Sequence, residues 1–242
     1  MEIRTAQIGE PLEDLEDWYA WPEGRAWLRC MMLTTLDGAA RGADGLSGSL
    51  SCPADEQVFA EVRRFAHAIL VGAGTIRAEG YQPVHARSGD VDLRVRLGLG
   101  KAPVLVVVSA SLDLPWHSAV FRESTMRPVI VTSVAAPVER LSMASDCCDV
   151  ISLEGSLLDP VQFVSALAYK GLTRIVCEGG PHLLAQLSEA RLIDEADITI
   201  APTLAGGGQV PTGPATADPA HLRLASIIER DGWLFTRYVR GG

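Results

Sequence analysis

The stretch Ala68–Tyr81 reads AILVGAGTIRAEGY, an apolar run that leads directly into a glycine turn. Its Gly72-Ala73-Gly74 matches the first half of the dinucleotide-binding pattern G-x-G-x-x-G, but Arg77 stands where the third glycine is required. The stretch therefore predicts a strand-to-helix unit of an α/β fold that is not a Rossmann site.

Short apolar runs of the same kind recur along the chain. Several are continuously apolar, such as Val104–Val108, which is typical of strands buried on both faces of a mostly parallel sheet. Asp231-Gly232 near the C-terminus predicts a two-residue hairpin and hence an antiparallel edge. The predicted strands are Trp27–Thr34, Ala68–Gly72, Pro103–Ser109, Arg127–Thr132, Val150–Leu153, Arg174–Cys177, Ala196–Pro202 and Trp233–Arg240, with one more strand before Asp231.

Three segments between the strands have helical spacing. They are PADEQVFAEVRRFA, DPVQFVSALAYKG and the segment after Gly179-Gly180-Pro181. Gly171 follows the second and predicts its C-terminal end. The residues expected to face inward are Val58, Phe59, Val62 and Phe65 in the first, Val161, Val164, Leu167 and Ala168 in the second, and Leu183, Leu184 and Leu187 in the third.

No repeat or linker divides the chain. The one polar interruption, Val84–Lys101, reads as an excursion from a single domain over residues 27–242. Residues 1–26 are expected to form an acidic leader that packs on the core. They lack the cationic start and apolar run of a signal peptide.

Composition excludes several classes of function. The 242 residues carry a net charge of −9, which argues against a nucleic-acid surface. No apolar run approaches the ~20 residues of a membrane helix. Five cysteines, with Cys147 and Cys148 adjacent, do not suggest a disulfide framework, so we expect a reduced, cytoplasmic protein. No histidine or cysteine spacing fits a metal site, and neither a Walker lysine nor a G-x-S-x-G motif is present.

Two glycine loops have the chemistry of an anion site. Gly72–Thr75 and Glu178–Pro181 each follow a predicted strand and open a helix, where free N–H groups and close backbone approach suit a phosphate. The alternative is that both are tight turns without a ligand.

Four side chains near these loops have two interpretations. Thr75 is either an N-cap or a phosphate ligand, and Arg77 is either a surface charge or a cation beside a nucleotide. Ser109 and Ser111 are either turn hydroxyls or donors to a 2′-phosphate.

The residues of the loop and helix near the N-terminus also allow two interpretations. Asp37-Gly38 is a turn by default. Asp55 could merely favour the helix dipole, and Arg63 and Arg64 could be plain surface charges.

Several motifs together resemble the pyrimidine reductases of riboflavin biosynthesis, the reductase domain of a bifunctional deaminase/reductase. These are TTLDG, SGSLSCP, an arginine in the next helix, AILVGAGT, VVVS, EGGPHLL and LIDEADITIAPTLAGG, in that order. The resemblance spans about residues 28–240. It implies a three-layer α/β/α fold like that of dihydrofolate reductase, and hydride transfer from NADPH to C1′ of 5-amino-6-(5-phosphoribosylamino)uracil or a related diaminopyrimidine. It also implies a homodimer.

The matching positions give an expected site. Ser47, Arg63 and Glu178 would contact the substrate, and Asp37 and Glu178 would lie at the reacting centre. The residues expected at the cofactor are Leu33, Ser49, Gly72, Gly74, Thr75, Arg77, Glu79, Ser109, Ser111, Gly179, Gly180, Pro181, His182 and Leu183.

The chain also departs from this pattern. AEGY replaces A-D-D-P, Ser49 replaces the family's tryptophan, and the arginine expected after the glycine turn is displaced to Arg87. One segment resembles a different enzyme family. CPADEQVF is similar to the L-P-A-D helix start of dihydrofolate reductases, and by this resemblance Asp55 would hold a pterin. Dihydrofolate reduction is therefore an alternative, for which Asp55→Asn would matter much more than for the phosphorylated pyrimidine. A catalytically silent NADP-binding protein is a second alternative.

Overall fold

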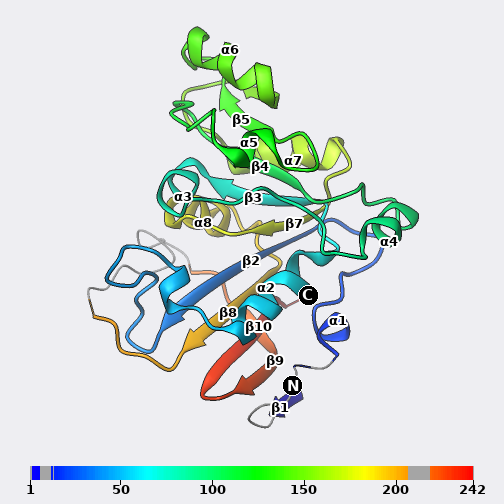
Figure 1. Cartoon of the computed structure of the whole chain (residues 1–242), viewed down its shortest axis with the longest axis vertical. Coiled ribbons are helices and arrows are strands. Elements are labelled where there is room, and N and C mark those ends of the chain that lie inside the picture. Colours follow the sequence, from blue (N-terminus) through cyan, green and yellow to red (C-terminus); the bar gives the residue numbers. More distant parts are fainter. Residues whose placement is uncertain (1, 6–11, 13, 207–218, 242) are drawn as a thin grey trace. The chain divides into compact units, whose positions relative to one another are not determined.

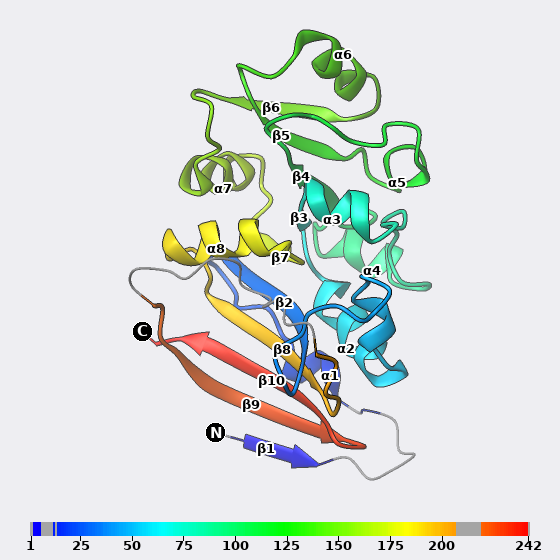
Figure 2. The same cartoon turned by 90° about the vertical axis from the view of Figure 1, so that its left-hand side faces the viewer.

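The computed structural model describes residues 2–5, 12, 14–206 and 219–241. It forms two compact units, one made of Met1–Arg63 with Cys177–Gly242 and the other of Arg64–Val176. Most elements of both units are labelled in Figure 1, and β6 is labelled in Figure 2.

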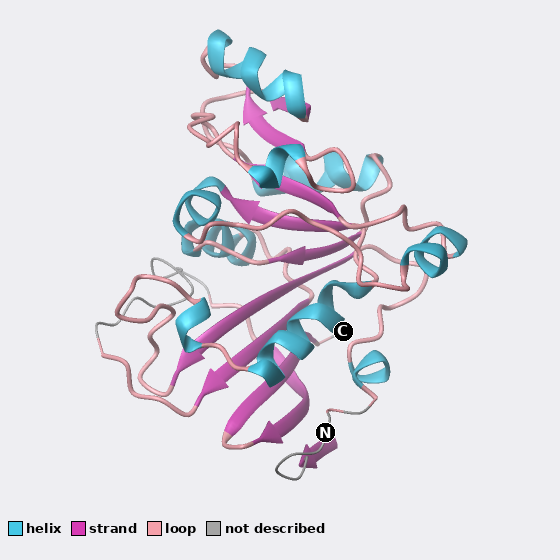
Figure 3. Ribbon diagram, in the orientation of Figure 1, coloured by secondary structure: helices cyan, strands magenta, loops and turns pink. Residues whose placement is uncertain are grey.

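The unit of residues 64–176 is built on parallel strands. Its strand order is β7 (Arg174–Cys177), β3 (Ala68–Gly72), β4 (Val104–Val108), β5 (Val129–Ser133) and β6 (Asp149–Leu153). The pairs β3–β4, β4–β5 and β5–β6 are parallel. The central strands are apolar throughout because helices cover both faces. These helices are α3 (Ala73–Ala78), α4 (Val91–Arg96), α5 (Ala119–Arg122), α6 (Val138–Cys147) and α7 (Pro160–Tyr169) (Figure 3).

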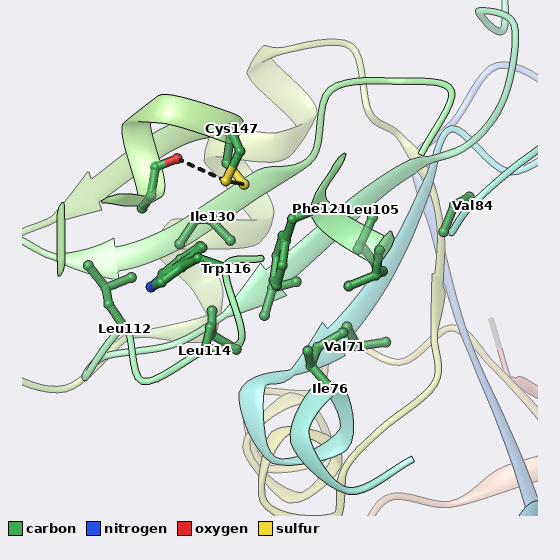
Figure 4. Packing of buried hydrophobic residues seen from close by; sticks show 14 of the residues in the cluster. Val71, Ile76, Val84, Leu105, Leu112, Leu114, Trp116, Phe121, Ile130 and Cys147 are labelled. Carbon is green, nitrogen blue, oxygen red and sulfur yellow. Dashed lines mark hydrogen bonds between the residues drawn. The ribbon is translucent and has the colours of Figure 1, made fainter. Parts of the chain in front are cut away.

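One face of these strands carries the core shown in Figure 4. Val71, Leu105 and Ile130 project from three neighbouring strands and are almost fully buried. Trp116 and Phe121 pack above them, with ring centroids 5.1 Å apart. The intervening strand residues point to the opposite face, on which α7 lies in Figure 2.

The excursion of this unit is anchored by a buried arginine. Arg94 in α4 donates to the carbonyl oxygens of Arg64, Ala66 (2.9 Å) and Leu99 (3.3 Å). Arg64 in turn donates two bonds to Asp90, at 2.8 and 3.0 Å. Arg64 is therefore not a plain surface charge.

The other unit carries the antiparallel end. Its strand order is β1 (Glu2–Thr5), β9 (Leu222–Arg230), β10 (Trp233–Arg240), β8 (Glu195–Ala201) and β2 (Trp27–Thr35). The pairs β2–β8 and β1–β9 are parallel, and β10 is antiparallel to both β8 and β9. Asp231 and Gly232 have φ of 52° and 84°, as the predicted hairpin turn requires.

Short helices flank this unit as well. They are α1 (Leu15–Trp18), the 3-10 turn η1 (Gly48–Leu50), α2 (Pro53–Arg64) and α8 (Pro181–Glu189). The predicted fold class is thus confirmed, since mostly parallel strands end in an antiparallel hairpin and helices flank them.

Most predicted strands match the observed ones to within two residues, but one predicted helix face was wrong in part, although its Leu167 is buried. In α7 the buried residues are Phe163 and Leu167, whereas Val161 is 49% exposed. The predicted inward residues of α8 are all buried. In α2, Val58 and Val62 are buried, while Phe59 is only half-buried.

The N-terminal leader contributes the edge strand β1 and contacts a buried ion-pair network of the neighbouring strands. Arg29 in β2 is fully buried, donates to the Tyr19 carbonyl (3.1 Å) and stacks on Trp21 (3.8 Å to the ring centroid). Its guanidinium lies 3.3 Å from Glu195, which also accepts two bonds from Arg237. Residues 6–11 and 13 of the predicted leader lie outside the described residues.

Candidate active site

Asp55 is held from both sides at the start of α2. Its Oδ2 accepts a bond from Ser51 Oγ (2.6 Å), and its Oδ1 accepts one from Thr199 Oγ1 (2.7 Å) in β8. The residue is 7% exposed. The first turn of a helix is favourable for a carboxylate because backbone N–H groups are free there. Leu33, the neighbour of Thr199 across β2 and β8, lies on the same face and is half-buried.

Arg63 and Glu178, expected at the substrate, contact each other. Arg63 Nε and Nη2 donate to the two carboxylate oxygens of Glu178, both at 2.5 Å. The guanidinium also stacks over Phe59 in the preceding turn, 4.0 Å from the ring centroid. A two-bond arginine–carboxylate pair fixes the orientation of both groups. Arg63 is therefore not a plain surface charge.

Asp37 ties the L-D-G turn to the loop after β8. It accepts bonds from Thr35 Oγ1 (2.5 Å), Ala205 N (3.1 Å) and Gly206 N (2.7 Å). These bonds, the one from Thr35 first, lower the pKa of Asp37 to about 2. At neutral pH the group is an acceptor without a proton to give, so its contacts support positioning of the loop.

The serine-rich loop before α2 is bonded within itself. Ser49 Oγ lies 2.9 Å from Asp44 Oδ1, to which it donates, and 3.1 Å from the Leu46 carbonyl. Ser47 precedes η1 and is half-buried. The structure thus places both residues in the loop that leads to Asp55.

The predicted cofactor turn lies at the carboxyl ends of β3 and β4. Gly72, in an extended conformation, is the N-cap of α3, and Thr75 is the buried third residue of the helix. The N-cap interpretation of Thr75 was therefore wrong. Because Gly72 pairs with Val108, the turn lies next to Ser109. Glu79 ends the helix and is half-buried.

Two arginines donate hydrogen bonds to backbone carbonyl groups of the loop after β4. Arg77 donates to the Asp113 carbonyl (2.7 Å), and Arg140 from α6 donates to the Ser111 carbonyl (2.9 Å). Ser109 Oγ accepts a bond from the Leu112 N–H (3.1 Å). Arg140 was not predicted, because its helix was not recognised in the sequence.

The second glycine loop leads into α8. Gly179 has φ of 85°, which favours glycine, and the side chain of Met32 lies 3.5 Å from where a Cβ would stand. Gly180 is the N-cap and Pro181 the first helical residue. His182 is exposed, whereas Leu183 is buried, so only the backbone of Leu183 is suited to meet a ligand.

A family model, the RibD C-terminal domain, matches residues 26–232. The chain belongs to this family. Two relatives of this chain are named 2,5-diamino-6-ribosylamino-4(3H)-pyrimidinone 5′-phosphate reductase. The one from Methanothermobacter thermautotrophicus is 32% identical over 174 residues, which cover 72% of this chain and 76% of the relative. The one from Aquifex aeolicus is 27% identical over 208 residues, covering 82% and 88%.

A solved structure supports the same family. The pyrimidine reductase-like protein of Corynebacterium diphtheriae is similar to this RibD C-terminal domain with a TM-score of 0.80 and 27% identity, over 88% of this chain and 91% of that one. The names of the relatives support an oxidoreductase.

The described residues meet neither the requirements of a metal site nor those of a membrane-spanning helix. Within the described ranges, no group of three or more histidine, cysteine, aspartate or glutamate side chains is placed to hold a metal ion. No helix in the part of the chain that the structure describes has the length and apolar character to cross a membrane.

Proposed function

We propose that this chain is an NADPH-dependent reductase of riboflavin biosynthesis that transfers hydride to C1′ of 5-amino-6-(5-phosphoribosylamino)uracil or a related diaminopyrimidine. The observation that carries the proposal is the contact between Arg63 and Glu178. The two residues lie 115 positions apart in the chain and stand at positions that the resemblance assigns to the substrate. The names of the relatives supply the class of reaction.

The residues at the ends of β3 and β4 suit a dinucleotide phosphate. When bound, the nicotinamide cofactor would supply the hydride. Nothing lies within 4 Å of where a Cβ of Gly74 would stand, so the turn is open to an approaching group. Thr75 and Ser109 would offer hydroxyl contacts, and the guanidinium groups of Arg77 and Arg140 favour an anion at this loop.

The other unit would hold the substrate. Arg63 is 27% exposed, and Glu178, at 5% exposure, fixes its orientation. We assign Arg63 to the 5′-phosphate. Asp37 would keep the loop after β8 in place. Orientation of this kind contributes to hydride transfer by holding the reacting groups in one geometry.

A reduced, cytoplasmic homodimer completes the proposal. All five cysteines are free thiols, which supports the reduced state. The dimer rests on the family resemblance alone. Light scattering should give twice the monomer mass, and a monomer mass at micromolar concentrations would exclude the dimer.

Dihydrofolate reduction is the second candidate function, and Asp55 is the observation that favours it. A buried carboxylate with an acceptor oxygen on each side suits the ring of a pterin. A catalytically silent NADP-binding protein is the alternative of another class, and steady oxidation of NADPH with either substrate would exclude it.

The test is a paired assay of NADPH oxidation. Arg63→Ala should lower turnover of the phosphorylated pyrimidine about ten- to several-hundred-fold, on the order of 1.5–3 kcal/mol for a lost charged contact. Arg127→Ala is the control, because Arg127 is half-exposed in a surface ion pair with Asp149. If the wild type reduces dihydrofolate efficiently, ignores the pyrimidine and loses activity with Asp55→Asn, the proposal is wrong and the second candidate is right.

A further inference from the structure

Two adjacent cysteines in the unit of residues 64–176 bring their sulfur atoms together. Cys147 is the last residue of α6, and Cys148, in an extended conformation, is the C-cap of that helix and precedes β6. Successive side chains of a regular strand point to opposite faces. Here the change from helix to strand turns both thiols inward, and the two Sγ atoms lie 3.6 Å apart. Both are free thiols. The chain thus presents a preformed pair of thiols.

The surroundings of this pair are apolar. Cys147 is 7% exposed and Cys148 2%, and both belong to the core cluster of Trp116 and Ile130 (Figure 4). Burial, and next the neighbouring Cys147, raise the pKa of the Cys148 thiol. Among the described residues, no third histidine, cysteine, aspartate or glutamate joins the two cysteines in a group that could hold a metal ion. Because a buried charge is costly, the ligand that fits is held by two sulfurs in a product without net charge.

The distance between the sulfurs decides how they can be bridged. A disulfide usually has its Cα atoms at least about 4.4 Å apart, whereas those of adjacent residues are only about 3.8 Å apart across a trans peptide. A linearly coordinated ion, with bonds of about 2.3 Å like those of zinc to thiolate, needs sulfurs about 4.6 Å apart. Across the observed 3.6 Å, two bonds of that length meet at roughly 100°. Such a bent angle suits a pyramidal, three-coordinate atom, and zinc itself would lack two of its usual four ligands.

We propose that Cys147 and Cys148 form a binding site for trivalent organoarsenicals, compounds in which arsenic carries one organic group and two hydroxyl groups. Each thiol proton leaves with one hydroxyl group as water. Two S–H and two As–O bonds break, two As–S bonds form, and two water molecules are released. Arsenic stays trivalent, so the step needs neither an oxidant nor a reductant. The product is neutral and pyramidal and needs no third ligand from the protein. This site is independent of the proposed reductase function.

Mass spectrometry of the whole chain with methylarsonous acid tests the site. The folded protein is incubated with the arsenical, freed of excess reagent and then unfolded in N-ethylmaleimide. We expect one methylarsenic unit and three alkylated cysteines, because two of the five thiols are held by arsenic. The tryptic peptide Leu141–Lys170 contains Cys147 and Cys148 and no other cysteine, so the arsenic should lie on it. Arsenic on another peptide, or alkylation of all five cysteines, overturns the proposal.

Binding measurements show whether the folded structure makes the site, since the two thiols are also adjacent in the unfolded chain. Cys148→Ala should weaken the binding of methylarsonous acid in calorimetry at least about a hundredfold, because the second, intramolecular bond is lost. Cys52→Ala is the control, since Cys52 is more exposed than either thiol of the pair and should leave the dissociation constant unchanged.

Urea unfolding of the wild type needs no variant and so remains decisive if Cys148→Ala does not fold. Excess methylarsonous acid should raise the urea midpoint, because a ligand that binds the folded state more tightly than the unfolded chain stabilises it. A midpoint that stays or falls would show that the unfolded chain captures the arsenical at least as well. That result, or equal affinity of a folded Cys148→Ala protein, overturns the proposal.

Discussion

Replacing Asp197 with asparagine should remove a pH-dependent loss of stability. Asp197 in β8 is 2% exposed, and neither carboxyl oxygen has a hydrogen-bond partner among the described residues. Burial, and then the neighbouring Glu195, raise the pKa of Asp197 well above its usual range, whereas Arg29 and Arg237 act in the opposite direction. Asp197 is therefore the protonated member of this cluster, and Glu195, bonded to Arg237 and Trp27, is the ionised one.

The sign and size of the effect follow from proton linkage. In the unfolded chain an aspartate loses its proton near pH 3.9, so above that pH folding must take up a proton at Asp197. The contribution of this proton to the free energy of unfolding is fully present below about pH 4. As the pH rises further, it falls by about 1.4 kcal/mol per pH unit until the folded-state pKa of Asp197 is reached. Asparagine takes up no proton. At pH 7 the variant should therefore be the more stable of the two proteins, and the difference should shrink as the pH is lowered toward 4.

Urea unfolding at intervals from about pH 5 to pH 8 measures this difference. The free energy of unfolding of the wild type should fall with rising pH relative to that of Asp197→Asn, and the gap should widen until the pH passes the folded-state pKa of Asp197. Asp149→Asn is the control, since Asp149 is 57% exposed in a surface ion pair and should follow the wild type. Parallel curves for the wild type and Asp197→Asn would mean that Asp197 is ionised in the folded protein, and the reasoning would fail.

Three further predictions concern the cofactor, the excursion and metals. NADPH should bind at least about tenfold more tightly than NADH, because Ser109, Ser111 and Arg77 offer donors for a 2′-phosphate at ~1.5–3 kcal/mol each; equal dissociation constants in a fluorescence titration would remove this assignment. Arg94→Met should lower the free energy of unfolding by about 2–4 kcal/mol, because three carbonyl oxygens lose their donor, and a urea midpoint that does not move would contradict it. Turnover should survive a chelator; activity that is lost and then restored by zinc would reveal a metal.

Most of the fold could be predicted because the strands are short, continuously apolar runs between turn residues. The features of the fold that were not predicted, β1 and the buried face of α7, depend on contacts with distant parts of the chain. Glu2–Thr5 has no apolar run, and it becomes β1 by pairing in register with β9. In α7 the stripe that begins at Val161 was off by part of a turn, because the structure buries Phe163 and Leu167, four residues apart.

The chemistry of the site was more predictable than its contacts. The family resemblances pointed to Asp55, Arg63 and Glu178, but not to their partners. Asp55 is bonded to Thr199, which lies 144 positions away, and no local pattern indicates such a pair. The expected roles of these residues at a substrate stay predictions until the assays are done.

One face of β8 links the stability of this unit to its candidate site. Glu195, Asp197 and Thr199 occupy every second position of the strand, so all three side chains point to the same side of the sheet. Polar side chains on a buried strand face are costly unless they are paired. Glu195 is hydrogen-bonded to Arg237 and Thr199 to Asp55, whereas Asp197 between them accepts no hydrogen bond among the described residues and lies 4.0 Å from the Arg29 guanidinium. A one-residue slip of β8 would turn all three away from their partners. The register that pairs Glu195 with the arginines is therefore also the register that brings Thr199 to Asp55, so the buried ion pairs help to set the orientation of the Asp55 carboxylate.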